Sequence, residues 1–167
     1  MAYRTKIYVA FDGDTDIHYY YLMKAWTNNE KFEFEINDAH DINYSRDTSQ
    51  EQSIKNQLRI RLQNSKVFIL LVGENTKYLR KFVPWEIDFA LKNNMPIIVV
   101  NLNGKRDRDN DRCPPILRDE LVVHLSFNHK IIQHAIDNWP AEFLKLKQNN
   151  EKSARYYNDD TYKRYGL

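Results

Sequence analysis

Lys66 to Asn94 read KVFILLVGENTKYLRKFVPWEIDFALKNN, and the rest of the predicted fold is built around this segment. Its residues 67–72 are six consecutive apolar residues, a pattern typical of a strand that is buried on both faces. Turn-forming and small polar residues follow at 73–76. Apolar residues at helical spacing then predict a helix that begins at Pro84, whose fixed φ suits a first turn, and ends at Asn93.

Glu86 falls in the first turn of this predicted helix, where a carboxylate is stabilised by the positive end of the helix dipole. It also follows the carboxyl end of a buried strand, where open α/β sheets place their ligand clefts. From its position alone, Glu86 is either a site residue or simply a residue that favours the start of a helix.

Strands and helices alternate along the whole chain. Apolar runs predict strands at 7–11, 96–102 and 121–125, and strict alternation at 32–36 predicts a half-exposed strand at a sheet edge. Amphipathic segments predict helices at 18–27, after Ser49 and after Asn128, both of which are candidate N-caps, and Pro140 is expected to divide the last helix. The pattern predicts an α/β fold, a flavodoxin-like and mainly parallel sheet of five strands in the order 2-1-3-4-5 with helices on both faces.

Particular side chains are expected in the core. Tyr19, Leu22, Met23 and Trp26 form the predicted buried face of the first helix, and Ile54, Leu58 and Leu62 that of the second, with Lys55, Arg59 and Arg61 solvated. The charged segment 103–115 is predicted to be a solvated loop. The tail from Asn149 has no clear periodicity, so packed and loose arrangements both remain open.

Composition narrows the classes of function. The 167 residues suit one domain, and a net charge of +2 is too small to favour binding to nucleic acid or membranes. The single cysteine, Cys113, cannot form an intrachain disulfide, and no apolar stretch suits a signal peptide or a membrane span. We therefore expect a cytoplasmic protein.

The acidic turn after the first strand, Asp12 to Asp16, lies at the predicted switch point together with residues 73–76. It lacks the glycine and glutamate of an EF-hand loop, and it lacks a threonine two residues after Asp14 that a haloacid dehalogenase-type phosphatase would have. A receiver domain would need an aspartate at the end of the third strand. A solvated capping turn and, less well supported, a phosphatase site remain as alternatives. The five histidines show no metal spacing, and no glycine-rich nucleotide fingerprint is present.

Three stretches together resemble the TIR-like proteins of the Thoeris antiphage defence system, of the ThsB type. They are KIYVAFDGDTD, TSQEQSIKNQLRIRLQNSKVFILLVGENT and FVPWEIDFALKNNMPIIVVNLN, and the similarity runs from about residue 6 to 127. We divide the chain into a TIR-like domain, residues 1–148, and a C-terminal extension, residues 149–167.

The resemblance implies a TIR fold, NAD as substrate without another cofactor or a metal, and cleavage of the nicotinamide–ribose bond. It implies that Glu86, matching the glutamate of a W-x-x-x-E-like motif, is catalytic, although Phe82 stands where that motif usually has tryptophan. The product would be a cyclic ADP-ribose-type signal for a separate effector protein. Topology adds substrate-contacting residues: Phe11, Asp12, Asp14, Gly73, Thr76 and Trp85.

The chemistry is consistent with these residues, because loss of neutral nicotinamide leaves positive charge on the ribose, which a carboxylate stabilises. A non-catalytic TIR interaction module is the alternative, with self-association through the loop 37–48 and the helix that carries Glu86.

Overall fold

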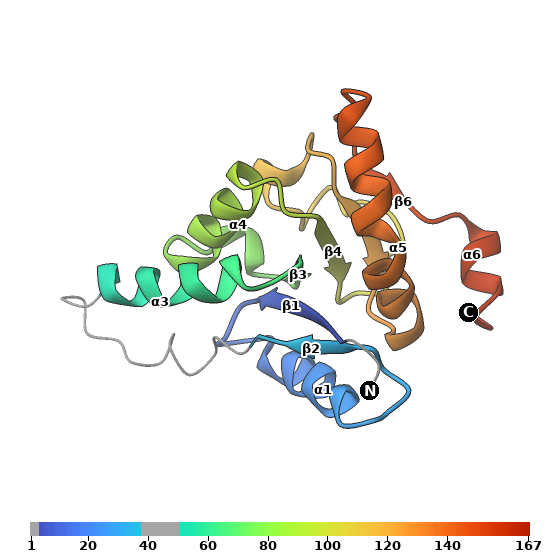
Figure 1. Ribbon diagram of the computed structural model, residues 1–167, viewed down its shortest axis with the longest axis horizontal. Helices are drawn as coiled ribbons and strands as arrows, with labels where there is room; N and C mark the ends of the chain where they lie inside the picture. Colours follow the sequence, from blue (N-terminus) through green and yellow to red (C-terminus); the bar gives the residue numbers. More distant parts are fainter. Residues whose placement is uncertain (1–3, 38–50) are drawn as a thin grey trace.

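A computed structural model describes residues 4–37 and 51–167. The predicted Ser49 cap and most of the loop 37–48 lie outside these residues. Within them, six parallel strands form one sheet in the order β2-β1-β3-β4-β5-β6, which confirms the predicted order of five strands and adds a sixth (Figure 1). The strands are β1 (Thr5–Ala10), β2 (Phe34–Ile36), β3 (Val67–Val72), β4 (Ile97–Asn101), β5 (Val123–Ser126) and β6 (Arg155–Tyr156).

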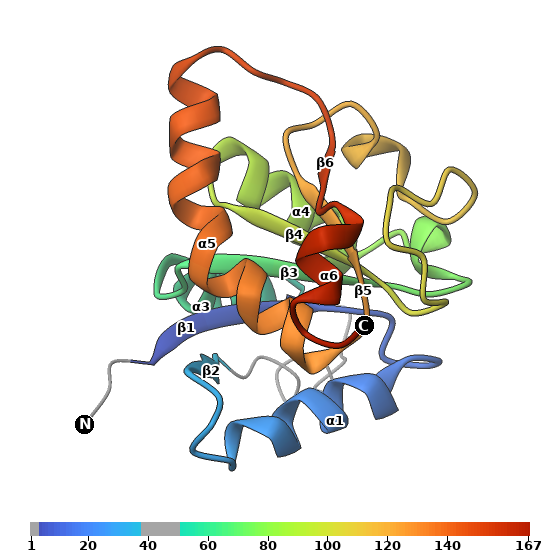
Figure 2. The same ribbon diagram turned by 90° about the vertical axis from the view of Figure 1, so that its right-hand side faces the viewer.

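The helices cover both faces of this sheet, as predicted. They are α1 (Ile17–Thr27), α3 (Glu51–Gln63), α4 (Phe82–Lys92), α5 (His129–Gln148) and α6 (Asp159–Lys163), with short 3-10 turns η2 (Thr76–Tyr78) and η3 (Pro115–Leu117). Residues of α1 and α5 share one core with one face of the sheet, and residues of α3 and α4 share a second core with the other (Figures 1 and 2). The domain therefore has three layers.

Strand β3 lies at the centre of the sheet, between β1 and β4, and all six of its residues are buried. Ile69 and Leu71 enter the core beneath α1 and α5, whereas Phe68 and Leu70 enter the core beneath α3 and α4. This two-sided burial is why the strand is apolar throughout instead of alternating.

The first helix buries most of the predicted face, with Leu22 as the exception. Tyr20 and Met23 are its fully buried residues, while Leu22 is 49% exposed, so the expectation for Leu22 was wrong. Tyr19 and Trp26 are partly buried against the core as predicted. The helix is apolar on nearly every side, so its periodicity selects no unique face. By contrast, the predicted stripe of α3, Ile54, Leu58 and Leu62, is buried.

The last helix is not divided at Pro140. Helix α5 runs unbroken from His129 to Gln148, begun by Asn128, whose side chain accepts a hydrogen bond from Lys130 N at 2.8 Å. The prediction of a break at Pro140 was therefore wrong. A proline removes one backbone hydrogen bond, and the flanking Trp139 and Phe143 are buried against the sheet, which favours a continuous helix.

The C-terminal extension packs on the domain. Strand β6 pairs with β5, with Arg155 opposite Val123 and Tyr156 opposite His124. The fully buried Tyr162 of α6 lies under the Arg106 guanidinium, 4.1 Å from the ring centroid, and its hydroxyl accepts a hydrogen bond from Ser126 N at 3.3 Å. Of the two arrangements left open for the tail, the packed one is correct.

The charged connector after β4 is a largely exposed loop, as predicted, with a few buried residues that anchor it. Asp109 is buried and accepts hydrogen bonds from Asn103 Nδ2 at 2.7 Å and from the backbone N–H groups of Asp111 and Arg112. Cys113 is also fully buried, and burial raises its pKa to about 11. The prediction of a solvated loop is therefore confirmed for most of the segment, and Asp109, Cys113 and Pro114 are the buried exceptions.

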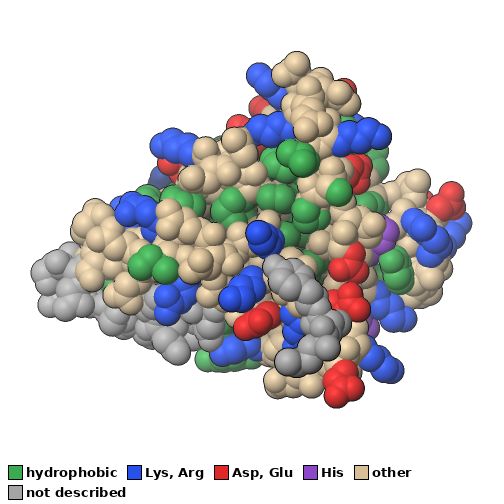
Figure 3. Space-filling model, viewed as in Figure 1, with side chains coloured by type: hydrophobic (Ala, Val, Ile, Leu, Met, Phe, Trp, Pro, Cys, Tyr) green, Lys and Arg blue, Asp and Glu red, His purple; other side chains and the backbone are tan. Residues whose placement is uncertain are grey.

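The surface has no single sign of charge on the face seen in Figure 3. Basic and acidic side chains are interspersed there, and hydrophobic side chains gather between α4 and α5. Among the helices of residues 4–37 and 51–167, none combines the length and the hydropathy needed to cross a bilayer.

Candidate active site

The acidic turn after β1 is organised by Asp12, which is buried. Its Oδ1 accepts a hydrogen bond from Asp14 N at 3.1 Å, and its Oδ2 accepts one from the Thr15 hydroxyl at 2.6 Å. Its backbone carbonyl accepts a third from Asp16 N at 2.9 Å, immediately before α1. Asp12 therefore fixes the path of the chain from β1 into α1, and Asp14 remains exposed at the tip.

The end of β3 meets this turn, as the topology predicts. A Cβ atom on Gly73 would meet the Asp16 carboxylate, 2.7 Å from Oδ1 and closer still to Oδ2. Glycine is thus required for the approach of Asp16 to the backbone. The Gly73 N–H donates a hydrogen bond to Thr76 Oγ1 at 2.9 Å, which closes the turn after β3. The predicted residues Asp12, Gly73 and Thr76 are thereby brought together at the carboxyl ends of β1 and β3.

Asp16, the last residue of the acidic turn predicted at the switch point, is also a member of this cluster, although the sequence did not single it out as a substrate contact. It is 7% exposed, and its Oδ2 has no hydrogen-bond partner among the described residues. Burial, and then the neighbouring Asp12 charge, raise its pKa above the ordinary value. Its place at the start of a helix suggested only a cap, yet its side chain makes no capping hydrogen bond.

Glu86 lies on the buried face of α4, with Val83, Ile87 and Ala90, and is only 2% exposed. Helix α4 begins at Phe82 instead of Pro84, so Glu86 is its fifth residue and lies beyond the first turn. The predicted helix start was wrong. Pro84 is the third residue of the helix, where a backbone N–H would have no intrahelical acceptor, so a proline is accommodated there without loss of a hydrogen bond. The predicted stabilisation of Glu86 by the helix dipole therefore does not apply.

Burial raises the pKa of Glu86 to about 8, and the Tyr8 hydroxyl acts in the opposite direction. Tyr8 projects from β1 into the same core, is 1% exposed, and stacks on Phe68 with ring centroids 5.7 Å apart. Its hydroxyl has no hydrogen-bond partner within the described part of the chain. Sequence reasoning counted Tyr8 only as an apolar strand residue.

The structure thus has a parallel sheet, acidic and glycine-containing turns at its switch point, and a glutamate on the helix after β3. A comparison of the sequence with known families gives a match of the same kind. The family described as Thoeris protein ThsB, TIR-like domain, matches residues 8–107, which is more than half of the chain. The chain belongs to this family. It is thus a TIR-type protein of Thoeris defence, as the resemblance indicated.

Two other predicted contacts of this TIR-like domain, Phe11 and Trp85, pack against neighbouring aromatic or basic side chains. Phe11 stacks on Tyr20 of α1, with centroids 4.7 Å apart and planes at 15°, and packs against the core under α1 and α5. Trp85 lies between α3 and α4, with Lys55 Nζ 5.9 Å and the Arg59 guanidinium 5.8 Å from its ring. The predicted solvated face of α3 is therefore partly covered by this packing.

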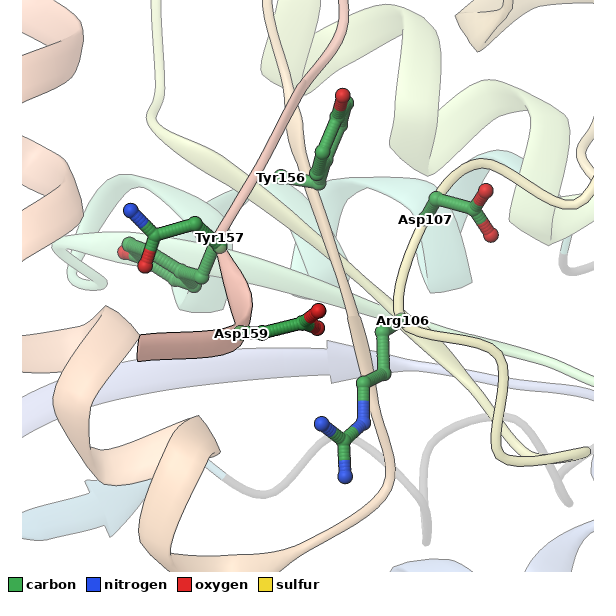
Figure 4. A pocket seen from close by; sticks show the side chains of 6 residues that line it. Arg106, Asp107, Tyr156, Tyr157 and Asp159 are labelled. Carbon is green, nitrogen blue, oxygen red and sulfur yellow. The ribbon is translucent and has the colours of Figure 1, made fainter. Parts of the chain in front are cut away.

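A separate depression of about 420 Å³ lies between the TIR-like domain and its C-terminal extension. Arg106 and Asp107 line it from the loop after β4, and Tyr156, Tyr157, Asn158 and Asp159 line it from the extension (Figure 4). None of the predicted site residues borders it.

The ThsB-type chain also carries a buried histidine, His124 of β5, whose ring nitrogens have no hydrogen-bond partner among the residues described. Burial lowers its pKa to about 4, so the ring is neutral near pH 7 and acts as a packing residue. In the described ranges, no group of three or more His, Cys, Asp or Glu side chains is arranged to hold a metal ion.

Proposed function

We propose that this TIR-like protein is an enzyme that cleaves the nicotinamide–ribose bond of NAD in the cytoplasm and makes a cyclic ADP-ribose-type signal for a separate effector protein. Glu86 is the catalytic carboxylate. The observation that carries this proposal is a single buried carboxyl group on the inward face of α4, in a segment that matches the family.

The reaction places a specific demand on Glu86. Nicotinamide departs as a neutral molecule and takes the bonding electron pair, so positive charge develops on the ribose carbon and its ring oxygen. An ionised carboxylate beside that carbon stabilises the charge, whereas a neutral one does so far less. With a pKa of about 8, roughly one Glu86 in ten is ionised at pH 7 in the buried state.

The turn cluster supplies the contacts expected for the rest of the substrate. Asp12 and Asp16 offer carboxylate oxygens at the switch point, which suit ribose hydroxyl groups as donors, and Gly73 leaves backbone space beside them. Thr76 shapes the same turn. Phe11, Asp14 and Trp85 remain proposed contacts at the margins of the site.

The test is NAD turnover, with product mass, for wild type and Glu86→Gln recovered from phage-challenged cells. The exposed Glu30→Gln protein is a matched control for loss of a carboxylate. We expect release of nicotinamide and an ADP-ribose-derived product from wild type and the control, and a loss of about a hundredfold or more in the Glu86 variant. Full activity of Glu86→Gln would remove the proposal.

The second candidate is a TIR interaction module without catalysis. The burial of Glu86, at 2% exposure, favours it, as do Tyr21 and Leu22, which lie about half exposed on the outer side of α1. A Glu86→Gln protein that folds normally and retains full phage protection, together with no NAD turnover by either protein, would favour this module.

A further inference from the structure

We infer that Arg112, in the connector after β4, binds the diphosphate of the dinucleotide substrate beside the turn after β3. Because Arg112 would serve the proposed NAD site, this role rests on the proposed function. Arg112 lies outside residues 8–107 that match the family, and it is not among the substrate contacts predicted from the sequence.

The turns at the proposed site carry no basic side chain. Residues 12–16 and 73–76 contribute four acidic ones, Asp12, Asp14, Asp16 and Glu74. NAD has a negative charge on each of its two phosphate groups, so these turns alone would repel the centre of the substrate. Arginine suits a diphosphate because its planar guanidinium can donate two parallel hydrogen bonds to phosphate oxygens. A basic side chain from a neighbouring segment is therefore expected.

The connector after β4 lies beside the turn after β3. The two strands pair up to their carboxyl ends, so the segments that follow them leave the sheet next to each other (Figure 2). Two contacts join these segments. Lys77 Nζ donates a hydrogen bond to the Asp111 carbonyl, and Arg112 Nη2 lies 3.4 Å from Glu74 Oε1. The connector thus brings a guanidinium to the acidic end of β3.

Arg112 is distinguished from the other basic residues of this connector. The side chains of Lys105, Arg106 and Arg108 are directed to partners in the connector, the segment after it or the extension. Among the described residues, Arg112 is the basic side chain of the connector that contacts the turn after β3. The candidate for a phosphate contact is therefore a single residue.

The backbone of Arg112 is fixed, whereas its guanidinium is accessible. The Arg112 N–H donates a hydrogen bond at 3.0 Å to Oδ1 of Asp109, which is buried. The Arg112 side chain is 28% exposed. A side chain that starts from an anchored backbone loses less freedom when it binds a ligand than one on a loose loop.

The Glu74 carboxylate is a partner that a phosphate can displace. It meets Arg112 through one oxygen, and its side chain is 80% exposed, so this ion pair is weak and the carboxylate can return to water. Glu74 follows Gly73, which is in close contact with Asp16. Burial raises the pKa of Asp16, and the Arg112 charge is among the groups that oppose this effect, as expected for a cation near the turn cluster.

The experiment measures KM and kcat for NAD in protein recovered from phage-challenged cells, for wild type, Arg112→Gln and Glu74→Gln. Lys152→Gln, at an exposed position of the extension, is the control for loss of one positive charge. Inhibition by ADP-ribose, which has the diphosphate, and by adenosine, which lacks it, is measured with the same proteins.

We expect Arg112→Gln to raise KM about tenfold or more with kcat within about twofold, because a charge-assisted hydrogen bond is lost in ground state and transition state alike. Glu74→Gln should lower KM about two- to fivefold, because a competitor for the guanidinium is removed. Inhibition by ADP-ribose should weaken about tenfold in Arg112→Gln, whereas inhibition by adenosine should not change. Lys152→Gln should match wild type.

A purely structural role of the ion pair predicts a different pattern. Both variants would lose the same contact, so KM would shift in the same direction in Arg112→Gln and Glu74→Gln. That result, or equal weakening of inhibition by ADP-ribose and adenosine, overturns the inference. If Arg112→Gln folds poorly, the exposed Glu74→Gln decides, and a KM that is not lowered overturns the inference. An active Glu86→Gln overturns the proposed function instead, and absence of NAD turnover in wild type overturns both.

Discussion

Replacement of Glu86 by glutamine should remove a large pH dependence of folding stability. In the folded protein Glu86 has a pKa of about 8, against 4.5 for an unperturbed side chain. Above pH 4.5 the unfolded chain therefore releases a proton that the folded chain retains, and the contribution of this group to stability falls as pH rises until about pH 8. Glutamine has the same shape and no charge, so it should be free of this loss.

The magnitude follows from that interval of about three and a half pH units. At about 1.4 kcal/mol for each unit, the full loss is about 5 kcal/mol, and relaxation of the buried site brings the expected range to about 2–5 kcal/mol. The two proteins should have similar stability near pH 5, and Glu86→Gln should be the more stable by that amount at pH 8.5.

Urea unfolding monitored by circular dichroism between pH 5 and 8.5 provides the free energies of unfolding. Glu30→Gln, at an exposed position, should follow wild type throughout. Parallel curves for wild type and Glu86→Gln would refute the reasoning, because they would mean that the carboxyl is not desolvated in the folded protein. The assay needs no substrate, so it tests the burial of Glu86 independently of catalysis.

Three further predictions concern the framework of the site and its extension. Gly73→Ala should destabilise the protein by about 1–3 kcal/mol, because its Cβ displaces Asp16, while Gly13→Ala, with open space around it, should have little effect in the same urea assay. Tyr162→Ala should cost about 3–5 kcal/mol through loss of a buried ring, and a change below about 1 kcal/mol would contradict an extension integral to the fold; Tyr156→Ala, 67% exposed, is the control. Asn128→Ala should lower the free energy of unfolding by about 1 kcal/mol, because α5 loses its cap; unchanged stability would show that the cap is dispensable.

The parts of the fold that sequence predicted well are those where burial leaves one solution. An apolar run such as 67–72 suits only a strand covered on both sides, and alternation of such strands with helices limits the connections. Prediction was poorer where several solutions fit. Pro84 suits the first or the third position of a helix, and α1 is apolar on too many sides to distinguish Leu22 from Tyr20.

The site was predicted only as far as topology reaches. The ends of β1 and β3 meet, so Asp12, Gly73 and Thr76 could be grouped in advance. Tyr8 and Asp16 were not singled out, because each is distinguished by a polar atom that has no hydrogen-bond partner among the described residues, and local sequence does not determine which polar atoms are left in that state. The packing of Trp85 could not be predicted either, because the α3 side chains over its ring, Lys55 and Arg59, are distant from it in sequence.

The two outermost strands have a consequence for assembly. Strand β2 has three residues and β6 has two, so the edges of the sheet expose few backbone groups for pairing with another chain. Beyond the end of β6, the Ser126 N–H of β5 already donates a hydrogen bond to the Tyr162 hydroxyl, so it is not available to another strand. Growth of the sheet from molecule to molecule is thereby disfavoured at both ends. A lasting complex with this protein should therefore be built from side chains on the helices and loops and not from a continued β-ladder.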